Sequence, residues 1–218
     1  MSHAPIRLYN YFRSSASYRV RIALGLKELR YEYVPVHIVK KEHLAAEHHG
    51  RNPMEQVPAI ELEVDGKRRV VAQSMAILEL LEEIFPTHPL LPKDHYRRAR
   101  ARELAELVNA GIQPHQNMGP MARIDALAKG AGRAHAIHYN ESGLRALEER
   151  VKETAGEYCV GDHPTFADCC LVPQLFSARR FEIDVAHHFP TLTRIDAALA
   201  KLPGVFAAHP DRQPDSEK

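Results

Sequence analysis

The sequence predicts two domains, a mixed α/β domain over residues 1–85 and an all-α domain over residues 93–218. Three observations lead to this prediction. Strand and helix signals alternate through the first domain, three prolines interrupt residues 86–92, and only helical periodicity follows them. Because proline lacks a backbone N–H and restricts the chain, we expect residues 86–92 to link the two domains.

The first domain is expected to follow the order βαβαββα, with a hairpin before the last helix. Alternating apolar and acidic residues that turn at Asp65-Gly66 and then return indicate the hairpin. Strands are expected at residues 6–9, 31–36, 57–64 and 69–72. Helices are expected at residues 20–26, at residues 43–49 with Gly50 as their end, and at residues 74–84.

The second domain is expected to contain helices only, because no strand-like alternation recurs after the linker. Thr165 and Asp168 have the spacing of a capping box, which serves folding and not catalysis. The tail over residues 210–218 is expected to be extended or frayed. Helices are expected at residues 96–117 with a break at Pro114, and at residues 134–154, 165–180 and 192–202.

Composition narrows the functional classes. The 29 Lys and Arg residues against 28 Asp and Glu give a net charge of +1, so we expect no nucleic-acid partner. No segment approaches the ~20 apolar residues that span a bilayer, and the N-terminus lacks a signal-peptide pattern. We therefore expect a cytoplasmic protein with no membrane partner. Cys159, Cys169 and Cys170 have neither disulfide nor zinc spacing, which indicates reduced, structural thiols.

The histidines and a basic cluster have plain structural interpretations. Among 14 histidines, pairs such as His135 and His138 lack further ligands at a metal-binding spacing, so no metal is expected. Four arginines within residues 97–102 are followed by Glu103 and Glu106. At helical spacing this pattern favours a solvated face of ion pairs over a basic rim that attracts dianionic substrates.

The first candidate ligand site is the segment Arg13–Arg19, between the first strand and the first helix. Residues 13–17 contain three serines, two of them adjacent at Ser14 and Ser15. The free N–H groups and the dipole at a helix start favour an anion, and small hydroxyl side chains can bind a thiolate. The alternative is ordinary N-capping by one serine.

Two further segments suit the remaining parts of a peptide ligand. A cis proline in Gln56-Val57-Pro58 would expose the Val57 backbone for pairing with a peptide, although a trans proline at a strand entry is more frequent. Gln73-Ser74 begins a helix, where a hydroxyl and N–H groups suit a carboxylate. Taken alone, this serine is simply an N-cap.

These segments are part of a pattern over nearly the whole chain that resembles the zeta class of glutathione transferases, which includes maleylacetoacetate and maleylpyruvate isomerases. The resemblance implies the glutathione transferase fold, with a thioredoxin-like first domain and a helical second domain. It also implies glutathione as the cofactor and a homodimer. The motifs that carry it are Tyr11–Leu24, Asn52–Pro58, Gln73-Ser74, Gly111–Pro114, Asn117, Tyr158–Asp162, Ala167-Asp168, Leu171–Gln174, Ala178–Phe181 and Arg212–Asp215.

The resemblance also implies roles for individual residues. Arg13 and Arg180 would receive the acidic groups of the substrate and stabilise the enolate that forms. The residues implied for glutathione are Ser14 and Ser15 at the sulfur, the Val57 backbone at the cysteinyl part, Gln73 and Ser74 at the γ-glutamyl end, His43 at the glycyl carboxylate, Gln56, and Gln113 and Asn117 from the second domain.

The sequence departs from the family at Ala16, where the usual Ser-Ser-Cys signature has cysteine. A serine at a helix start suffices physically. Lowering a thiol pKa of about 8.5 by about two units takes roughly 2.7 kcal/mol. A hydrogen bond to a charged acceptor gives ~1.5–3 kcal/mol and the helix dipole ~0.3–1 kcal/mol. Because some isomerases of this kind also lack that cysteine, Ala16 slightly favours maleylpyruvate as the substrate.

The implied activity is glutathione-dependent cis–trans isomerisation of a maleyl diketo acid in aromatic catabolism, such as tyrosine degradation. The reaction would convert maleylacetoacetate to fumarylacetoacetate, or maleylpyruvate to fumarylpyruvate. The thiolate adds to the double bond, the resulting single bond rotates, and elimination regenerates glutathione. An alternative is a general zeta-type transferase or dehalogenase that acts on halogenated acids. The serines at positions 14 and 15, with Gln73, Ser74 and Arg180, disfavour a non-catalytic scaffold.

Overall fold

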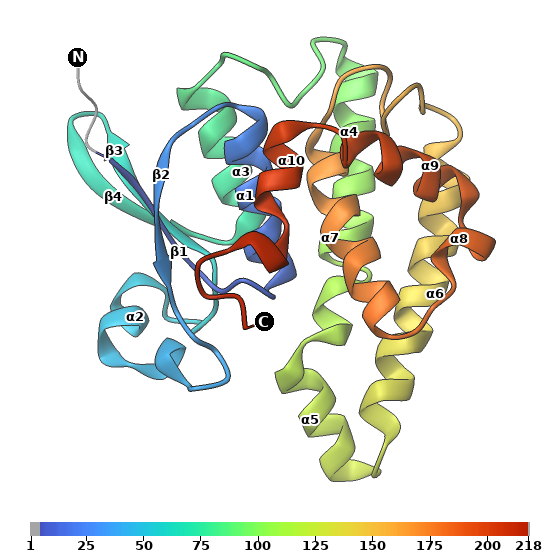
Figure 1. Ribbon diagram of the computed structural model, residues 1–218, viewed down its shortest axis with the longest axis horizontal. Helices are drawn as coiled ribbons and strands as arrows, with labels where there is room; N and C mark the ends of the chain where they lie inside the picture. Colours follow the sequence, from blue (N-terminus) through green and yellow to red (C-terminus); the bar gives the residue numbers. More distant parts are fainter. Residues whose placement is uncertain (1–4, 218) are drawn as a thin grey trace. The chain divides into compact units, whose positions relative to one another are not determined.

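The computed structural model describes residues 5–217, which form two compact units (Figure 1). The first unit contains the chain up to Pro89 and also the segment that begins at Lys201. The second unit spans Leu90–Ala200. The chain therefore returns to its first unit after completing the second, whereas the sequence led us to expect one uninterrupted domain from residue 93 to residue 218.

A four-stranded sheet lies at the centre of the first unit, in the order β2-β1-β3-β4 (Figure 1). β1 and β2 are parallel, whereas β3 is antiparallel to both β1 and β4. The strands are β1 (Ile6–Asn10), β2 (Tyr31–Pro35), β3 (Ala59–Val64) and β4 (Lys67–Ala72). Together with the helices between them, they confirm the predicted order βαβαββα.

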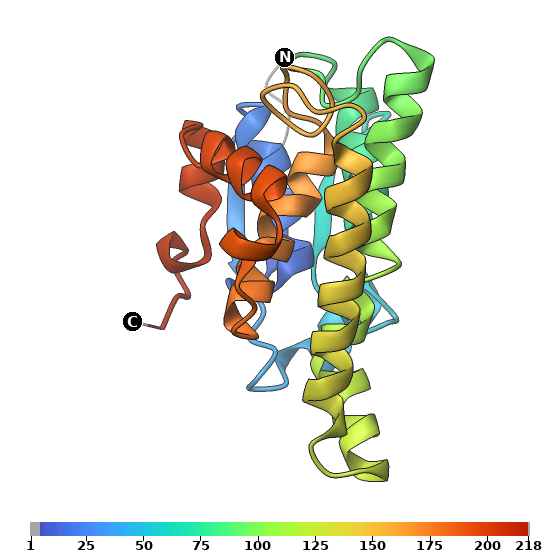
Figure 2. The same cartoon turned by 90° about the vertical axis from the view of Figure 1, so that its right-hand side faces the viewer.

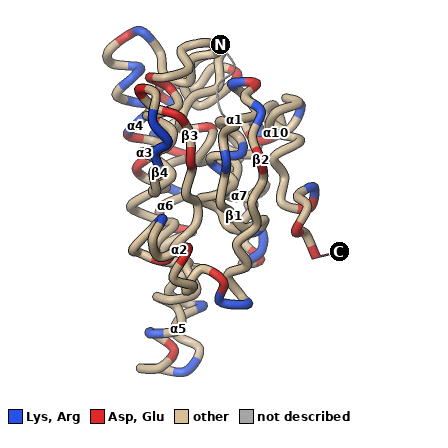
Figure 3. The backbone as a smooth tube through the Cα atoms, turned by 90° about the vertical axis from the view of Figure 1, so that its left-hand side faces the viewer, with Lys and Arg blue, Asp and Glu red and all other residues tan. Residues whose placement is uncertain are grey.

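The edge strand β4 is basic at its start. Figure 3 shows this stretch, Lys67, Arg68 and Arg69, beside acidic residues of β3. Arg68 forms an ion pair with Glu61 at 2.7 Å. Exposed charges on an edge strand oppose its pairing with a strand of another chain.

The helices of the first unit cover this sheet. α1 lies between α3 and α10 and contacts both. Its close approach to α10 requires two glycines, because a Cβ on Gly204 would lie 2.4 Å from the carbonyl carbon of Gly25. The helices are α1 (Ser15–Leu26), the 3₁₀ helix η1 (Glu42–Leu44), α2 (Ala46–Arg51), α3 (Ser74–Ile84), α10 (Pro203–Ala208) and the 3₁₀ helix η3 (Pro210–Arg212).

The expectation that Gly50 ends the second helix is wrong. α2 continues through Gly50 to Arg51, and open space surrounds the glycine. The helix stops where Asn52 becomes extended, with φ −144° and ψ 102°. Asn52 precedes Pro53, and the ring of a proline disfavours helical backbone in the residue before it.

The second unit is helical, as expected. Figure 2 shows that α6 is its longest helix, with α5 packed beside the start of α6. The helices are α4 (His95–Asn109), the 3₁₀ helix η2 (Gln113–Gln116), α5 (Met118–Leu127), α6 (Ala131–Val151), α7 (Phe166–Arg180), α8 (Val185–His188) and α9 (Pro190–Leu199).

The expected helix over residues 96–117 is too long. α4 ends at Asn109, and Pro114 lies in the first turn of η2. Proline is tolerated at that position because the N–H that it lacks would have no partner within the helix. α5 was not predicted, because it begins with Met118-Gly119-Pro120, and glycine and proline are poor helix formers.

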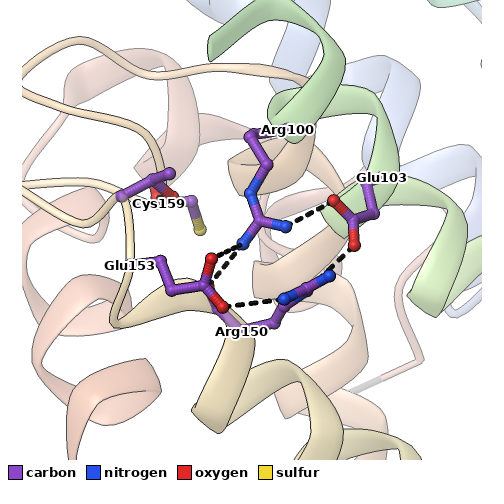
Figure 4. A network of polar contacts seen from close by, with 6 residues as sticks. Arg100, Glu103, Arg150, Glu153 and Cys159 are labelled. Atoms are coloured by element: carbon purple, nitrogen blue, oxygen red, sulfur yellow. Dashed lines mark hydrogen bonds and ion pairs between the residues drawn. The ribbon is translucent and has the colours of Figure 1, made fainter. Parts of the chain in front are cut away.

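An ionic network joins α4 to the end of α6 (Figure 4). Arg100 contacts Glu103 at 2.5 Å and Glu153 at 3.1 Å, and Arg150 contacts the same two carboxylates at 3.0 and 2.8 Å. The side chain of Arg100 is only 5% exposed. The expectation of a solvated basic face is therefore wrong for Arg100, because carboxylates from α4 and from the turn after α6 enclose it.

The predicted capping box begins α7. The buried Asp168 carboxylate accepts hydrogen bonds from the N–H and hydroxyl of Thr165 at 2.7 and 2.9 Å, and from the N–H of Cys159 at 3.0 Å. Burial raises the pKa of Asp168, and these donors act in the opposite direction. Asp168 therefore has a structural role, because it ties the start of α7 to the preceding loop.

Candidate active site

Three of the expected ligand-binding segments lie at one end of the sheet. In the strand register, Tyr9 of β1 pairs with Ala59 of β3, and Ala59 pairs with Ala72 of β4. β1 is about to enter the loop toward Ser14 at this level, β3 has just begun, and β4 is about to reach Gln73. Segments that are far apart in the sequence therefore meet beside the sheet.

Ser14 is the N-cap of α1. Its backbone is extended, with φ −67° and ψ 118°, and its hydroxyl oxygen accepts a hydrogen bond from the N–H of Ser17 at 3.2 Å. The capping interpretation of Ser14 is therefore correct, yet it leaves the hydroxyl proton available to an acceptor. The N–H groups of Ser15 and Ala16 have no acceptor within residues 5–217, and the first turn of α1 contains no acidic residue. This arrangement suits an anionic ligand.

The Val57–Pro58 peptide bond is cis, an isomer that the sequence left open beside the more frequent trans form. In residues 5–217, neither the N–H nor the carbonyl of Val57 has a hydrogen-bond partner. The preceding carbonyl, that of Gln56, is held by the ring of His48 at 3.0 Å and the amide of Asn52 at 2.8 Å. The buried His48 and Asn52 thus fix a turn whose next residue presents its backbone to a ligand.

Gln73 and Ser74 begin α3. Gln73 has φ +71° and ψ 113°, a conformation rare for a residue with a side chain and one that carries a cost of ~1–3 kcal/mol. Such strain is typical of functional sites. Ser74 is buried, and its hydroxyl accepts a hydrogen bond from the Arg19 guanidinium at 3.1 Å.

Arg19 is a residue that sequence reasoning missed. It lies on α1 and is 1% exposed. Its positive charge lies behind the start of α3, whose first turn contains no acidic residue, so both the side chain and the helix dipole favour a carboxylate there. Its position among the apolar residues of a helix that was expected to be buried could have indicated a role for this arginine.

His43 lies on η1 and is partly buried, near the Gln56 turn. Burial and the neighbouring His48 lower the pKa of His43. Its Nδ1 atom is buried and has no hydrogen-bond partner among the described residues. The lowered pKa favours the uncharged ring, whose N–H can donate a hydrogen bond to a carboxylate.

Arg13 is exposed and immediately precedes Ser14. Its guanidinium carbon lies 5.7 Å from the centre of the Phe12 ring, within the range of a cation–π contact. The side chain thus extends from the loop that carries the candidate serines, and its charge is open to an acidic group.

The other three expected residues belong to the second unit. Gln113 donates a hydrogen bond to Asn117 at 2.8 Å across η2. Arg180 is exposed in the last turn of α7, whereas its neighbour Arg179 forms an ion pair with Asp196 at 2.7 Å. Arg179 is thus held by a carboxylate of α9.

A buried amide cluster fixes the elements that carry these residues. Gln116 of η2, Asn140 of α6 and Gln174 of α7 exchange hydrogen bonds of 2.6–3.3 Å. A fully satisfied polar cluster specifies the packing of the helices that it joins. The cluster therefore holds η2, α6 and α7 in a defined arrangement.

Nowhere in residues 5–217 do three His, Cys, Asp or Glu side chains come together as metal ligands. In the same range, no helix has both the length and the apolar character that crossing a bilayer requires.

Family models match both parts of the chain. The glutathione S-transferase N-terminal domain model matches residues 4–83, and the C-terminal domain model matches residues 138–203. A probable maleylacetoacetate isomerase 2 of Drosophila melanogaster is 45% identical over 95% of this chain and 89% of its own length.

Solved structures of two proteins are similar to almost the whole chain. A maleylacetoacetate isomerase of Anaeromyxobacter dehalogenans with bound glutathione has a TM-score of 0.91 and 50% identity, over 98% of both chains. The same protein has also been solved with dicarboxyethyl glutathione and citrate in its active site. A bacterial maleyl pyruvate isomerase, described as a zeta-class glutathione S-transferase, has a TM-score of 0.89 and 41% identity, over 97% of this chain and all of the other.

These matches confirm the expected fold, a thioredoxin-like sheet domain with a helical C-terminal part. The identity to several isomerases exceeds 40% over nearly the full length. The chain belongs to the glutathione S-transferase family, among its zeta-class, maleylacetoacetate isomerase members.

Proposed function

We propose that this protein is a glutathione-dependent cis–trans isomerase of a maleyl diketo acid, either maleylacetoacetate or maleylpyruvate. The observation that carries the proposal is the N-terminus of α1, where the Ser14 hydroxyl and the unbonded N–H groups of Ser15 and Ala16 suit a thiolate. The names of the relatives narrow the substrate to compounds with a maleyl end.

The residues of the first unit fit the parts of glutathione. Ser14 and Ser15 would hold the sulfur, and the unpaired backbone of Val57 would pair with the cysteinyl part, as an added strand does. The carboxylate of the γ-glutamyl end would bind at Gln73 and Ser74, close to the charge of Arg19. The residues proposed to complete the site are Gln56, His43, Gln113 and Asn117.

When bound, glutathione supplies a thiolate that adds reversibly to the double bond of the substrate and is released unchanged. The Ser14 hydroxyl would donate a hydrogen bond to the sulfur and so stabilise the thiolate over the thiol. Arg13 and Arg180 would bind the carboxylates and stabilise the negative charge that develops on the substrate. This chemistry needs no second thiol, which agrees with alanine at position 16.

The proposed isomerase is expected to require glutathione and not to consume it. An assay of both maleylacetoacetate and maleylpyruvate, with and without glutathione, compares the loss of cis substrate with the free thiol concentration. Free thiol should stay constant while the cis substrate disappears, because elimination returns the thiol. Loss of one thiol per substrate would instead assign the protein to the alternative class, a transferase that conjugates halogenated acids or similar electrophiles.

We further propose that the protein is a homodimer in the cytoplasm. The first unit exposes the large apolar side chains of Met54 and Val70, which suit contact with a second chain. The three cysteines form no disulfide in the described chain, which suits a reducing compartment. Sedimentation equilibrium at micromolar concentration should give about twice the chain mass of 24.6 kDa. A mass of 24.6 kDa would refute the dimer.

A further inference from the structure

The C-terminal segment, residues 201–217, packs against the loop that carries Ser14. This loop, Tyr11–Arg13, connects β1 to α1 and ends at the candidate serine. Two side chains, Arg21 and Asp215, hold the loop and the C-terminal segment together.

Arg21 joins the loop to the end of α10. Its guanidinium is 1% exposed and donates hydrogen bonds to the carbonyls of Phe12 at 2.8 Å, Tyr11 at 3.4 Å and Ala208 at 3.1 Å. Burial lowers the pKa of Arg21, and nearby groups that include Asp215 act in the opposite direction. A single buried side chain therefore bonds to both the serine loop and the C-terminal segment.

Asp215 holds the same loop from its other side. Its carboxylate accepts hydrogen bonds from the N–H of Phe12 at 3.2 Å and from the hydroxyl of Tyr33 on β2. Both backbone groups of Phe12 are thus bonded, the carbonyl to Arg21 and the N–H to Asp215. Since Phe12 lies two residues before Ser14, these bonds restrict the backbone that sets the position of Ser14.

The C-terminal segment is itself ordered by specific contacts. The Gln213 amide donates to the carbonyls of Ala207 and His209, at 2.8 Å in both cases. The Arg212 guanidinium lies 3.5 Å from the centre of the Phe206 ring. The expectation of an extended or frayed tail is therefore wrong for the described residues 210–217, because Asp215 and Glu217 bond to the body of the first unit.

We propose that the C-terminal segment is a working part of the glutathione-activating site, and that Asp215 is a positioning residue for Ser14. The inference rests on the proposed function, because it concerns the same bound thiol. Asp215 acts through the Phe12 backbone and not by contact with the ligand. A displacement of about 1 Å at a catalytic group can lower a rate by up to about a hundredfold.

The test compares Asp215→Ala with Asp211→Ala. Asp211 lies in the same segment but is exposed, and it pairs with the neighbouring His209. The pKa of the bound thiol is read from the thiolate absorbance and from the pH profile of kcat/KM for the maleyl substrate at saturating glutathione. Asp215→Ala should raise that pKa by about one unit and lower kcat/KM about tenfold at neutral pH, and Asp211→Ala should change neither.

Two further variants keep the test decisive. Asp215→Asn retains one carbonyl acceptor and should recover part of the loss. Tyr33→Phe removes one of the two donors to the carboxylate and should give an intermediate thiol pKa, even if Asp215→Ala does not fold. A lower melting temperature with an unchanged thiol pKa and pH profile in these variants would overturn the inference. Absence of glutathione binding by the wild-type protein would instead refute the proposed function.

Discussion

Replacing Ser14 and Ser15 together by alanine is expected to lower kcat/KM about a hundredfold, the largest effect that we expect from a conservative change. The hydroxyl that stabilises the thiolate is worth ~1.5–3 kcal/mol. Without it, the pKa of bound glutathione should return toward the free value of about 8.5. The measurements are steady-state kinetics and the thiolate absorbance of bound glutathione as a function of pH.

The single variants separate the two serines. Ser14→Ala also removes the N-cap of α1, so it should cost about 1 kcal/mol of unfolding free energy in addition to activity. Ser15→Ala leaves the cap intact and reports on its own hydroxyl alone. Ser17→Ala is the matched control, because the Ser17 hydroxyl is buried and has no hydrogen-bond partner within residues 5–217. Wild-type kinetics in the double variant would remove both serines from thiol activation.

Arg180→Ala should lower kcat/KM for the maleyl substrate by roughly tenfold or more, with little change in glutathione affinity. The proposed contact is with the substrate carboxylate and the charge that develops on addition. Its loss therefore raises the free energy of the transition state. Arg180→Lys should recover only part of the activity, because an ammonium cannot reproduce the two-point grip of a guanidinium on a carboxylate. Kinetics with glutathione and substrate varied separately measure both effects.

The neighbouring arginine is the control for this prediction. Arg179 pairs with Asp196 and is about half exposed, so Arg179→Ala should leave the kinetics unchanged and cost at most about 1 kcal/mol of stability. A defect in Arg179→Ala with normal kinetics in Arg180→Ala would move the assignment by one residue. Normal kinetics in both variants would remove this end of α7 from substrate binding.

The first unit was largely predictable because its signals are local. Alternation of apolar and acidic residues, together with Asp65-Gly66, marked the β3–β4 hairpin, and the observed turn joins Val64 to Lys67. The strands at residues 6–9 and 31–36 differ from β1 and β2 by only one residue each at their ends. Period-two patterns and turn residues were sufficient there, since neither depends on distant parts of the chain.

The return of the C-terminal segment was not predictable from such signals. It depends on the contact of Gly25 with Gly204 and on the bond from Arg21 to Ala208, both between residues far apart in the sequence. A glycine within a helical pattern indicates only a weak helix former, and an arginine is normally expected at the surface. The structural roles of these residues can be recognised only when the residues that they contact are known.

The candidate site also contains some residues that could be predicted from the sequence and others that could not. The Ser14 helix start and the Gln73-Ser74 helix start were found from sequence, because capping residues have short-range signatures. Arg19 behind Ser74 and Asp215 beside Phe12 were not, because each acts across a long stretch of chain. The supporting residues of a site are thus harder to recognise than the residues that face the ligand.

The central claim is that glutathione acts as a catalyst in this protein, and one time course tests it most directly. The cis substrate is supplied in hundredfold excess over glutathione, and cis and trans isomers are followed by NMR together with free thiol. The proposed chemistry predicts complete conversion to the trans isomer, with every glutathione molecule used many times and recovered at the end. Conversion that stops at one substrate per glutathione, with the thiol lost, would contradict it.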